Sequence, residues 1–142
     1  MSRDLDRAIA IAVIRRGDEI LVSEVPDQLK DITGWRPPGG GIEFGERGAE
    51  TVVREIDEEL GERVVDPRYL GTVENIFTYL GIKGHQLVRV YAVRFADQEL
   101  YERDRFECIE ANGMRFTCLW KRIADFRGGV PLYPDGLIDL LT

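Results

Sequence analysis

Three glutamates on one flank of a predicted helix are the residues of this chain best suited to chemistry. Apolar residues recur at helical spacing between Glu46 and Gly61, at Ala49, Val52, Val53, Ile56 and Leu60. With about 100° per residue, Glu55, Glu58 and Glu59 share the flank beside this stripe. Neighbouring carboxylates repel one another, and a divalent cation such as Mg²⁺, which prefers oxygen ligands, would relieve that repulsion. A solvated acidic helix face is the alternative that this pattern leaves open.

A glycine-rich segment, Gly39-Gly40-Gly41, precedes the helix and follows two prolines. It is not a P-loop, because no Gly-Lys-Ser/Thr follows, and it is not a dinucleotide-binding motif, because the sixth residue from Gly39 is Phe44. A tight turn into the helix is the simplest interpretation. Glycine carbonyls can also approach a cation without obstruction by side chains. We expect Gly40 to adopt a positive φ, which glycine alone tolerates easily.

The spacing of these residues resembles the Nudix box, G-x5-E-x7-R-E-U-x-E-E-x-G-U, in which U is a large apolar residue. The match runs from Gly40 through Glu46, Arg54 and the helix glutamates to Gly61, and it satisfies eight of the nine specified positions. The exception is Glu62, where the box has an apolar residue that serves packing at the helix exit.

The resemblance implies a hydrolase that uses Mg²⁺ or Mn²⁺ and cleaves a nucleoside diphosphate linked to another moiety. Glu58 and Glu59 then correspond to the principal metal ligands, and Glu55 to a metal ligand or the general base. The carbonyl of Gly39 corresponds to a backbone metal ligand. Such a cation would polarise a bridging phosphate and lower the pKa of a bound water.

The resemblance also assigns positioning roles. Glu46 and Arg54 correspond to a pair that braces the loop against the helix, and Arg54 also orients the catalytic glutamates. Gly40 and Gly61 shape the two ends of the motif. A module of Nudix fold that binds nucleotides without turning them over is the alternative, because fold does not guarantee activity.

Four residues outside the box are candidates for contact with substrate. Trp35 could stack on a base and Arg36 could bind a phosphate. Glu110, in a later segment, could supply a further carboxylate, and His85 could contact substrate or transfer a proton. Three of them also have a simple structural interpretation, as packing for Trp35 and as a solvated loop or turn residue for Glu110 and His85.

The elements that must position these residues are predicted from apolar patterning. Strands are expected at 8–14, 19–24, 69–79, 85–95 and 115–121, with hairpins at 16–18 and 81–84. Loops are expected at 26–34 and 97–112, a helical turn at 123–126 and a short helix at 134–141. Residues 1–142 are therefore predicted to form one domain of the α/β (α+β) class, a Nudix-like α/β/α sandwich with a mixed sheet.

The composition of the chain excludes some classes of binding partner. The 19 Lys and Arg against 26 Asp and Glu give a formal net charge of -7, which argues against binding a nucleic acid polymer or an anionic membrane. No apolar run is long enough to span a bilayer. Two cysteines make a poor disulfide framework, so we expect reduced thiols in a cytoplasmic protein. The expected partner is a small-molecule diphosphate, and a homodimer is the default assembly.

Overall fold

The structure, a computed structural model, describes residues 6–27, 32–79 and 81–141. Its elements follow the chain in this order: β1 (Asp6–Arg16), β2 (Glu19–Asp27), β3 (Ile32–Arg36), β4 (Gly39–Gly41), α1 (Gly48–Leu60), β5 (Val64–Tyr79), β6 (Ile82–Phe95), η1 (Gln98–Glu102), β7 (Arg105–Ile109), β8 (Arg115–Arg122), α2 (Ile123–Arg127) and η2 (Leu137–Leu140). Here η marks a 3₁₀ helix.

The strands form one mixed sheet. Its main order is β5-β6-β1-β2-β8-β7, with β3 paired to β2 and β4 paired to β1. The β1–β6 pair is parallel, and the other paired strands are antiparallel. The mixed sheet expected from the sequence is therefore confirmed.

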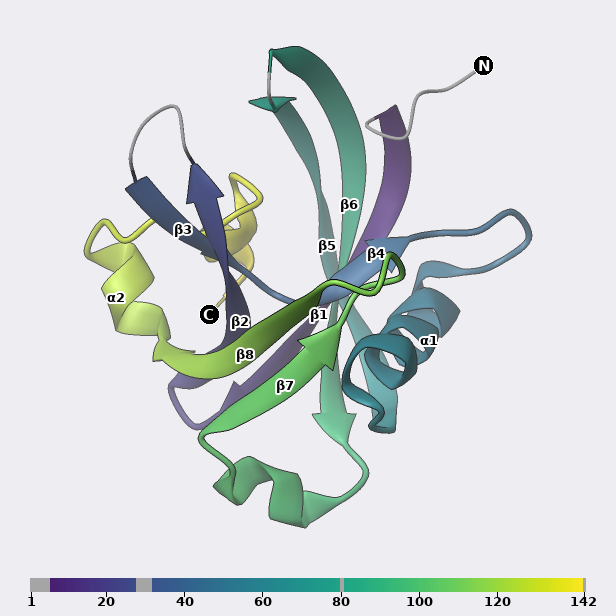
Figure 1. Cartoon of the computed structure of the whole chain (residues 1–142), viewed down its shortest axis with the longest axis vertical. Coiled ribbons are helices and arrows are strands. Elements are labelled where there is room, and N and C mark those ends of the chain that lie inside the picture. Colours follow the sequence, from purple (N-terminus) through teal and green to yellow (C-terminus); the bar gives the residue numbers. More distant parts are fainter. Residues whose placement is uncertain (1–5, 28–31, 80, 142) are drawn as a thin grey trace.

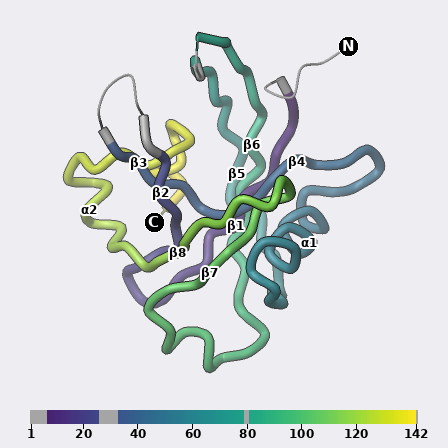
Figure 2. The backbone as a smooth tube through the Cα atoms, viewed as in Figure 1, coloured from purple at the N-terminus to yellow at the C-terminus, as the bar shows by residue number. Residues whose placement is uncertain are grey.

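Strand β1 separates two hydrophobic cores because its side chains alternate between the faces of the sheet. Ala10, Ala12 and Ile14 belong to one core, which α1 covers through Val52 and Ile56. The intervening Ile11 and Val13 belong to the other core, together with residues of α2 and η2. Figures 1 and 2 show α1 on one side of the sheet, away from α2 and the C-terminal segment. This is the layered arrangement that the sequence predicted.

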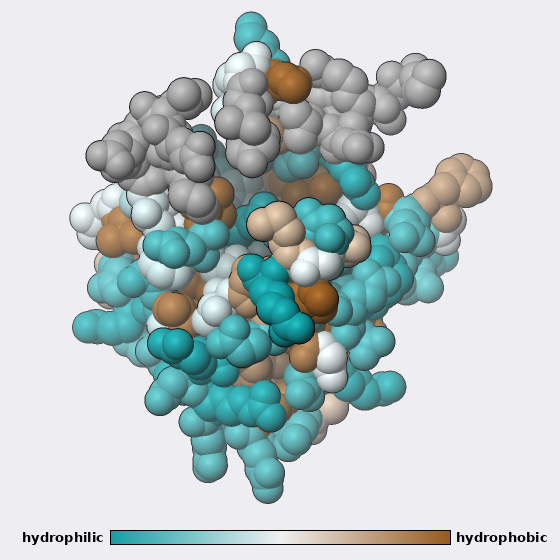
Figure 3. Space-filling view, in the orientation of Figure 1, coloured by the Kyte–Doolittle hydropathy of each residue, from teal (hydrophilic) through white to brown (hydrophobic). Residues whose placement is uncertain are grey.

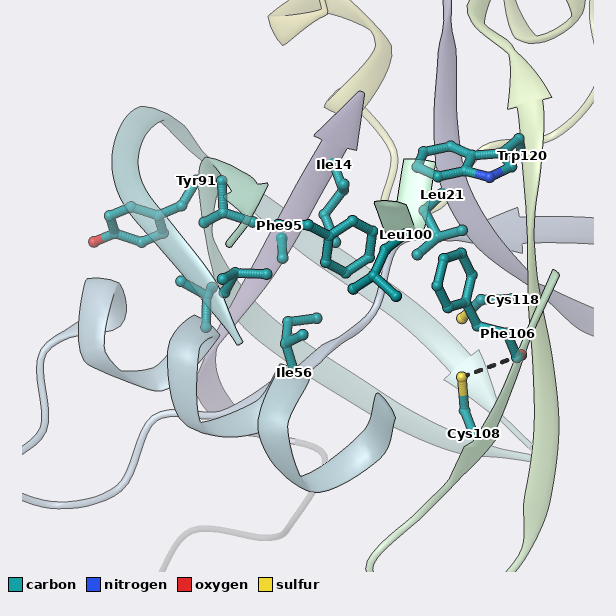
Figure 4. Packing of buried hydrophobic residues seen from close by; sticks show 14 of the residues in the cluster. Ile14, Leu21, Ile56, Tyr91, Phe95, Leu100, Phe106, Cys108, Cys118 and Trp120 are labelled. Carbon is teal, nitrogen blue, oxygen red and sulfur yellow. Dashed lines mark hydrogen bonds between the residues drawn. The ribbon is translucent and has the colours of Figure 1, made fainter. Parts of the chain in front are cut away.

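The core beneath α1 is rich in aromatic residues. In Figure 4, Ile56 points from α1 toward Phe95 and Leu100, while Phe106 and Trp120 lie to the right of Leu100. The rings of Phe95 and Phe106 are stacked with centroids 5.4 Å apart. The outer surface seen in Figure 3 is mostly hydrophilic, with small separate apolar areas. In the part of the chain that the structure describes, no helix is long and apolar enough to cross a membrane.

The glycine segment is held against β1 by main-chain pairing. Gly39, Gly40 and Gly41 lie opposite Ile11, Ala10 and Ile9 in an antiparallel register. A β-carbon on Gly39 would lie only 2.2 Å from the carbonyl oxygen of Ala10, so only glycine fits at that position. The segment therefore enters α1 from a fixed place on the sheet.

Several predicted boundaries were wrong. The loop expected at 97–112 contains η1 and β7. In β7 the buried Phe106 and Cys108 alternate with exposed residues, two of them charged, and the charged neighbours concealed this short strand. The loop expected at 26–34 is partly strand, since β2 reaches Asp27 and β3 begins at Ile32; residues 28–31 lie outside the described ranges. The predicted terminal helix at 134–141 is the shorter η2.

Candidate active site

Helix α1 begins later than predicted, at Gly48, and its two ends are well defined. Arg47 is the N-cap residue, and the side chain of Glu50 accepts a hydrogen bond from the Arg47 backbone N–H at 3.0 Å. At the other end, Gly61 is left-handed with φ 69°, and its N–H bonds to the carbonyl of Asp57. The two caps define where the helix that carries the glutamates begins and ends.

Arg54 connects the loop to the helix through one guanidinium group. Its Nε and Nη2 donate to the two oxygens of Glu46 at 2.8 and 2.9 Å, a bidentate pairing. Nη2 also donates to the carbonyl of Gly41 at 3.0 Å. Nη1 donates to Glu55 at 3.0 Å and to Glu58 at 3.2 Å. A single side chain therefore sets the positions of three carboxylates.

Glu46 is the most strongly held of these carboxylates. Hydrogen bonds from Arg54 lower its pKa to about 2, and a 2.7 Å hydrogen bond from the Thr51 hydroxyl acts in the same direction. Burial opposes the shift. Glu46 is thus a fixed anion, and its ion pair with Arg54 ties the β4–α1 loop to the middle of the helix.

Glu55 lies directly over the glycine segment. A β-carbon on Gly40 would be 2.5 Å from the carboxyl carbon of Glu55. The expectation of a positive φ at Gly40 was wrong: the positive-φ glycines of the chain include Gly45 and Gly61, but not Gly40. Gly40 is needed for close approach of the carboxylate, and not for an unusual backbone conformation.

Among the carboxyl groups that the structure describes, Glu59 has the largest shift in pKa. Burial, the negative charge of Glu55 and a hydrogen bond shared with Glu55 together raise its pKa to about 8, while the positive charge of Arg36 opposes the rise. Its Oε1 is buried and has no hydrogen-bond partner. Two acidic groups therefore meet in an enclosed place with one oxygen unsatisfied, which costs free energy unless a proton or a cation joins them.

The remaining helix glutamate, Glu58, differs from its neighbours in exposure. Its side chain is 53% exposed, compared with 16% for Glu55. Within the described ranges, no three Asp, Glu, His or Cys side chains form a ready cation site. Glu58 is instead paired with the guanidinium of Arg54, at 3.2 Å. The oxygen donors, with the unsatisfied Oε1 of Glu59, nevertheless have the chemistry that a hard cation requires.

Two of the predicted substrate residues lie near this cluster. Arg36 forms an ion pair with Glu110 at 3.6 Å, and both side chains are well exposed. Arg36 also acts electrostatically on Glu59. Arg36 ends β3, and Glu110 follows β7 in the connection to β8. Because β3 and β8 both pair with β2, these two residues, distant in sequence, lie together near the glutamates of α1.

The other two predicted residues have structural partners. The Trp35 ring lies 4.6 Å from Nζ of Lys121, and its backbone pairs with the segment around Leu132. His85 lies within β6, in agreement with the strand predicted at 85–95, and its Nε2 is 3.0 Å from a carboxylate oxygen of Glu74 on β5.

Two cysteines that were not predicted to belong to this site lie close to it. Cys108 and Cys118 are free thiols, both buried in the core beneath α1. A hydrogen bond with Cys108, reinforced by burial, raises the pKa of Cys118. The two thiols lie close enough to Glu59 that each is electrostatically coupled to it. The alternation of β7 was the one signal that could have placed Cys108 on this face.

Comparison with known proteins agrees with this arrangement. The sequence model of the NUDIX domain matches residues 4–127. The chain is 28% identical over 125 residues to the nucleoside triphosphatase NudI of Salmonella typhimurium, covering 84% of this chain and 79% of that protein. It is 37% identical over 70 residues to a Mycobacterium tuberculosis protein provisionally named mutator protein MutT4, covering 49% of this chain but only 28% of that protein.

Solved structures share the fold over nearly the whole chain. The MutT NUDIX hydrolase from Burkholderia pseudomallei superposes with a TM-score of 0.68 at 25% identity, covering 95% of both chains. A NUDIX hydrolase from Nitrosomonas europaea superposes with a TM-score of 0.64 at 17% identity, covering 95% of this chain and 85% of that one. The chain therefore belongs to the NUDIX family, and it is an enzyme of the Nudix hydrolase type.

Proposed function

We propose that this enzyme cleaves the diphosphate linkage of a nucleoside diphosphate joined to another moiety, by attack of water at phosphorus, with Mg²⁺ or Mn²⁺ as cofactor. The observation that carries the proposal is the meeting of Glu55 and Glu59, with a raised pKa and an unpartnered buried oxygen at Glu59. Such a site favours a cation over an empty state. The name of NudI, a nucleoside triphosphatase, supports a substrate derived from a nucleotide.

In this proposal, Glu55, Glu58, Glu59 and the carbonyl of Gly39 hold the cation. When bound, the cation supplies charge neutralisation at the phosphates and lowers the pKa of a bound water. The side chains of the protein orient the site and accept the proton. Arg54 keeps Glu55 and Glu58 oriented, and the Glu46–Arg54 pair keeps the loop fixed to the helix. Glu55 is the first candidate to accept the proton of the attacking water, with Glu110 and His85 the next.

Substrate recognition is assigned to the residues around Arg36. Its guanidinium is more than half exposed and lies beside Glu110, so it is free to bind a phosphate oxygen in exchange for that weak surface pair. Trp35 remains a candidate for stacking, although Lys121 already occupies one position over its ring. A cytoplasmic location, a homodimer and a single domain over 1–142 remain predictions from sequence.

The test is hydrolysis of a panel of nucleotide sugars, dinucleoside polyphosphates, nucleoside triphosphates and non-nucleotide diphosphates, with phosphate and pyrophosphate release as readouts. Each compound is assayed with Mg²⁺, with Mn²⁺ and with excess EDTA. Turnover of at least one compound that stops in EDTA is the expected result. Nucleotide binding without turnover of any compound would instead support the binding module. Equal turnover in EDTA would contradict the metal mechanism.

A further inference from the structure

A second site for an anion is indicated by an open pocket of about 820 Å³ at the far end of β1. Four of its lining residues are arginines, Arg15, Arg16, Arg68 and Arg94, and one is an aspartate, Asp66, so the lining carries a formal charge of +3. This is a strong local concentration of positive charge in a chain whose net charge is -7. Nothing in the proposed hydrolysis uses it.

Three of the arginines lie on one face of three adjacent strands. Val13 of β1 is paired with Ala92 of β6, and Ala92 is paired in turn with Arg68 of β5. Arg15 and Arg94 each lie two residues beyond that row on their own strands, and therefore on the same face of the sheet. The guanidinium groups of β1, β6 and β5 thus converge at one corner of the sheet.

A β-bulge places Arg68 in this row. Between Val65 and Arg68 the chain advances three residues, while its partner advances only two, from Arg94 to Ala92. Without the extra residue, Arg68 would point to the opposite face, toward α1. Asp66, within the bulge, has a φ of 55°, an uncommon value for a residue with a side chain, and it pairs with Arg94. The bulge therefore adds the positive charge of Arg68 to the pocket.

The arginines differ in how much of their charge is already used. Arg16 donates to Glu19 at 2.9 Å and to the carbonyls of Tyr101 and Arg103, and Arg94 is paired with Asp66. Among residues 6–27, 32–79 and 81–141, no ion pair engages Arg15 or Arg68. These two arginines are the ones available to a ligand.

Beside the charged residues the lining is mainly apolar, and its two uncharged polar side chains, Gln98 and Tyr101, already make hydrogen bonds with the backbone of Phe95. Val13, Leu70, Ala92 and Leu140 line it beside the arginines. Val13, Leu70 and Leu140 belong to the core of the α2 side of the sheet. A ligand that fits both parts carries a multiply charged phosphate group next to a nonpolar or aromatic moiety, because arginines recognise phosphate oxygens and the side chains beside them are mainly apolar.

We propose that this pocket binds a small molecule that carries a di- or triphosphate group, at a position separate from the hydrolytic site. Gly40, which contacts Glu55, is paired with Ala10 of β1. Arg15 lies five residues further along that strand, which corresponds to about 16 Å. The two sites therefore lie at different positions along β1, one beside its middle and one at its C-terminal end, and this proposal does not depend on the hydrolytic one.

The test is binding of inorganic pyrophosphate and of ADP to the whole chain in EDTA, by calorimetry and by methyl NMR. Without a cation the acidic cluster repels anions, which weakens binding at the hydrolytic site, and the comparison of variants shows how much of the remaining binding belongs to the arginine pocket. We expect the Arg15→Gln/Arg68→Gln double variant to weaken binding at least tenfold. The control is Arg63→Gln/Arg105→Gln, which removes the same charge from exposed arginines outside the pocket, and it should change affinity less than twofold.

The methyl signals of Val13, Leu70 and Leu140 should shift on binding, and those of Val52 and Ile56 under the acidic helix should not. Tighter binding of ADP than of pyrophosphate would show that the apolar floor contributes, and equal binding would show that the phosphates alone are recognised; both support the pocket. The proposal is overturned if the wild-type chain binds neither ligand at millimolar concentration, if both double variants lose affinity equally, or if the pocket methyl signals do not move.

Discussion

Gly40 and Glu55 lie so close together that the carboxylate occupies the space which a side chain at position 40 would need. A β-carbon there would be 2.5 Å from both the carboxyl carbon and one oxygen of Glu55. The glycine segment is fixed to β1 by backbone pairing, so the segment cannot easily retreat. The position of Glu55 is therefore determined jointly by the sheet and by the helix that carries it.

Gly40→Ala should displace Glu55 and reduce kcat at least tenfold while the fold survives, because the conflict is with the end of a side chain and not with the backbone. Circular dichroism and kcat at saturating Mg²⁺ measure the two effects. Gly128→Ala is the matched control: its φ is -82°, and its nearest contacts would be at 3.4 Å. Full activity of Gly40→Ala would show that the approach to Glu55 has no catalytic importance.

Arg54→Lys should reduce both activity and stability although it keeps the charge. A lysine cannot reproduce the bidentate contact with Glu46 while also reaching Gly41, Glu55 and Glu58. We expect a loss of about 1–3 kcal/mol in the free energy of unfolding, since the partly buried acceptors on Glu46, Glu55 and Gly41 lose a charged donor. A fall in kcat of about 10–100-fold should accompany it. Urea unfolding and steady-state kinetics are the measurements, with Arg63→Lys as an exposed control that should alter neither.

Arg36→Gln should raise KM without lowering stability. The Arg36–Glu110 pair is 3.6 Å long and well exposed, and such surface pairs contribute about 0–1 kcal/mol. Loss of a phosphate contact should therefore appear in KM, by about tenfold, while Tm stays within about two degrees. Glu110→Gln separates the two residues: if Arg36 acts only through this pair, both variants will behave alike, and the assignment of Arg36 to substrate fails.

The sequence predicted what depends on local spacing and missed what depends on pairing between distant strands. The stripe of α1 and the grouping of its glutamates follow from the helical repeat, so both could be read directly. The closeness of Gly40 to Glu55 could not, because it depends on the register of β4 against β1. The influence of Arg36 and Cys108 on Glu59 likewise depends on how β3 and β7 enter the sheet.

Stability of the metal-free enzyme should fall as pH rises toward 8. The folded pKa of Glu59, about 8, lies above its ordinary value of 4.5. The folded state therefore retains a proton that the unfolded state releases. The contribution of Glu59 is complete below about pH 4.5 and is lost progressively up to about pH 8. Urea unfolding in EDTA from pH 5 to pH 9 measures this.

Glu59→Gln should remove that dependence, because the amide is neutral at every pH. The Asp57→Asn variant is the control, since Asp57 lies on the exposed side of the same helix, and it should keep the wild-type slope. Adding Mg²⁺ to the wild-type enzyme at pH 8 should raise its free energy of unfolding again, because the cation binds the folded state. A slope unchanged in Glu59→Gln would mean that other groups cause it.

The three helix carboxylates should separate by role when kcat is measured against Mg²⁺ concentration. Glu58→Gln and Glu59→Gln each remove a charge from the proposed cation site, so apparent metal affinity should fall and excess Mg²⁺ should partly restore turnover. If Glu55 is the general base, Glu55→Gln should lower kcat by about 10²–10⁴-fold, and excess Mg²⁺ should not restore it. Metal rescue of Glu55→Gln would instead make Glu55 a ligand and move the base to Glu110 or His85. Near-wild-type kcat for all three variants at ordinary Mg²⁺, with Asp57→Asn as the reference, would show that these carboxylates form only a solvated acidic face.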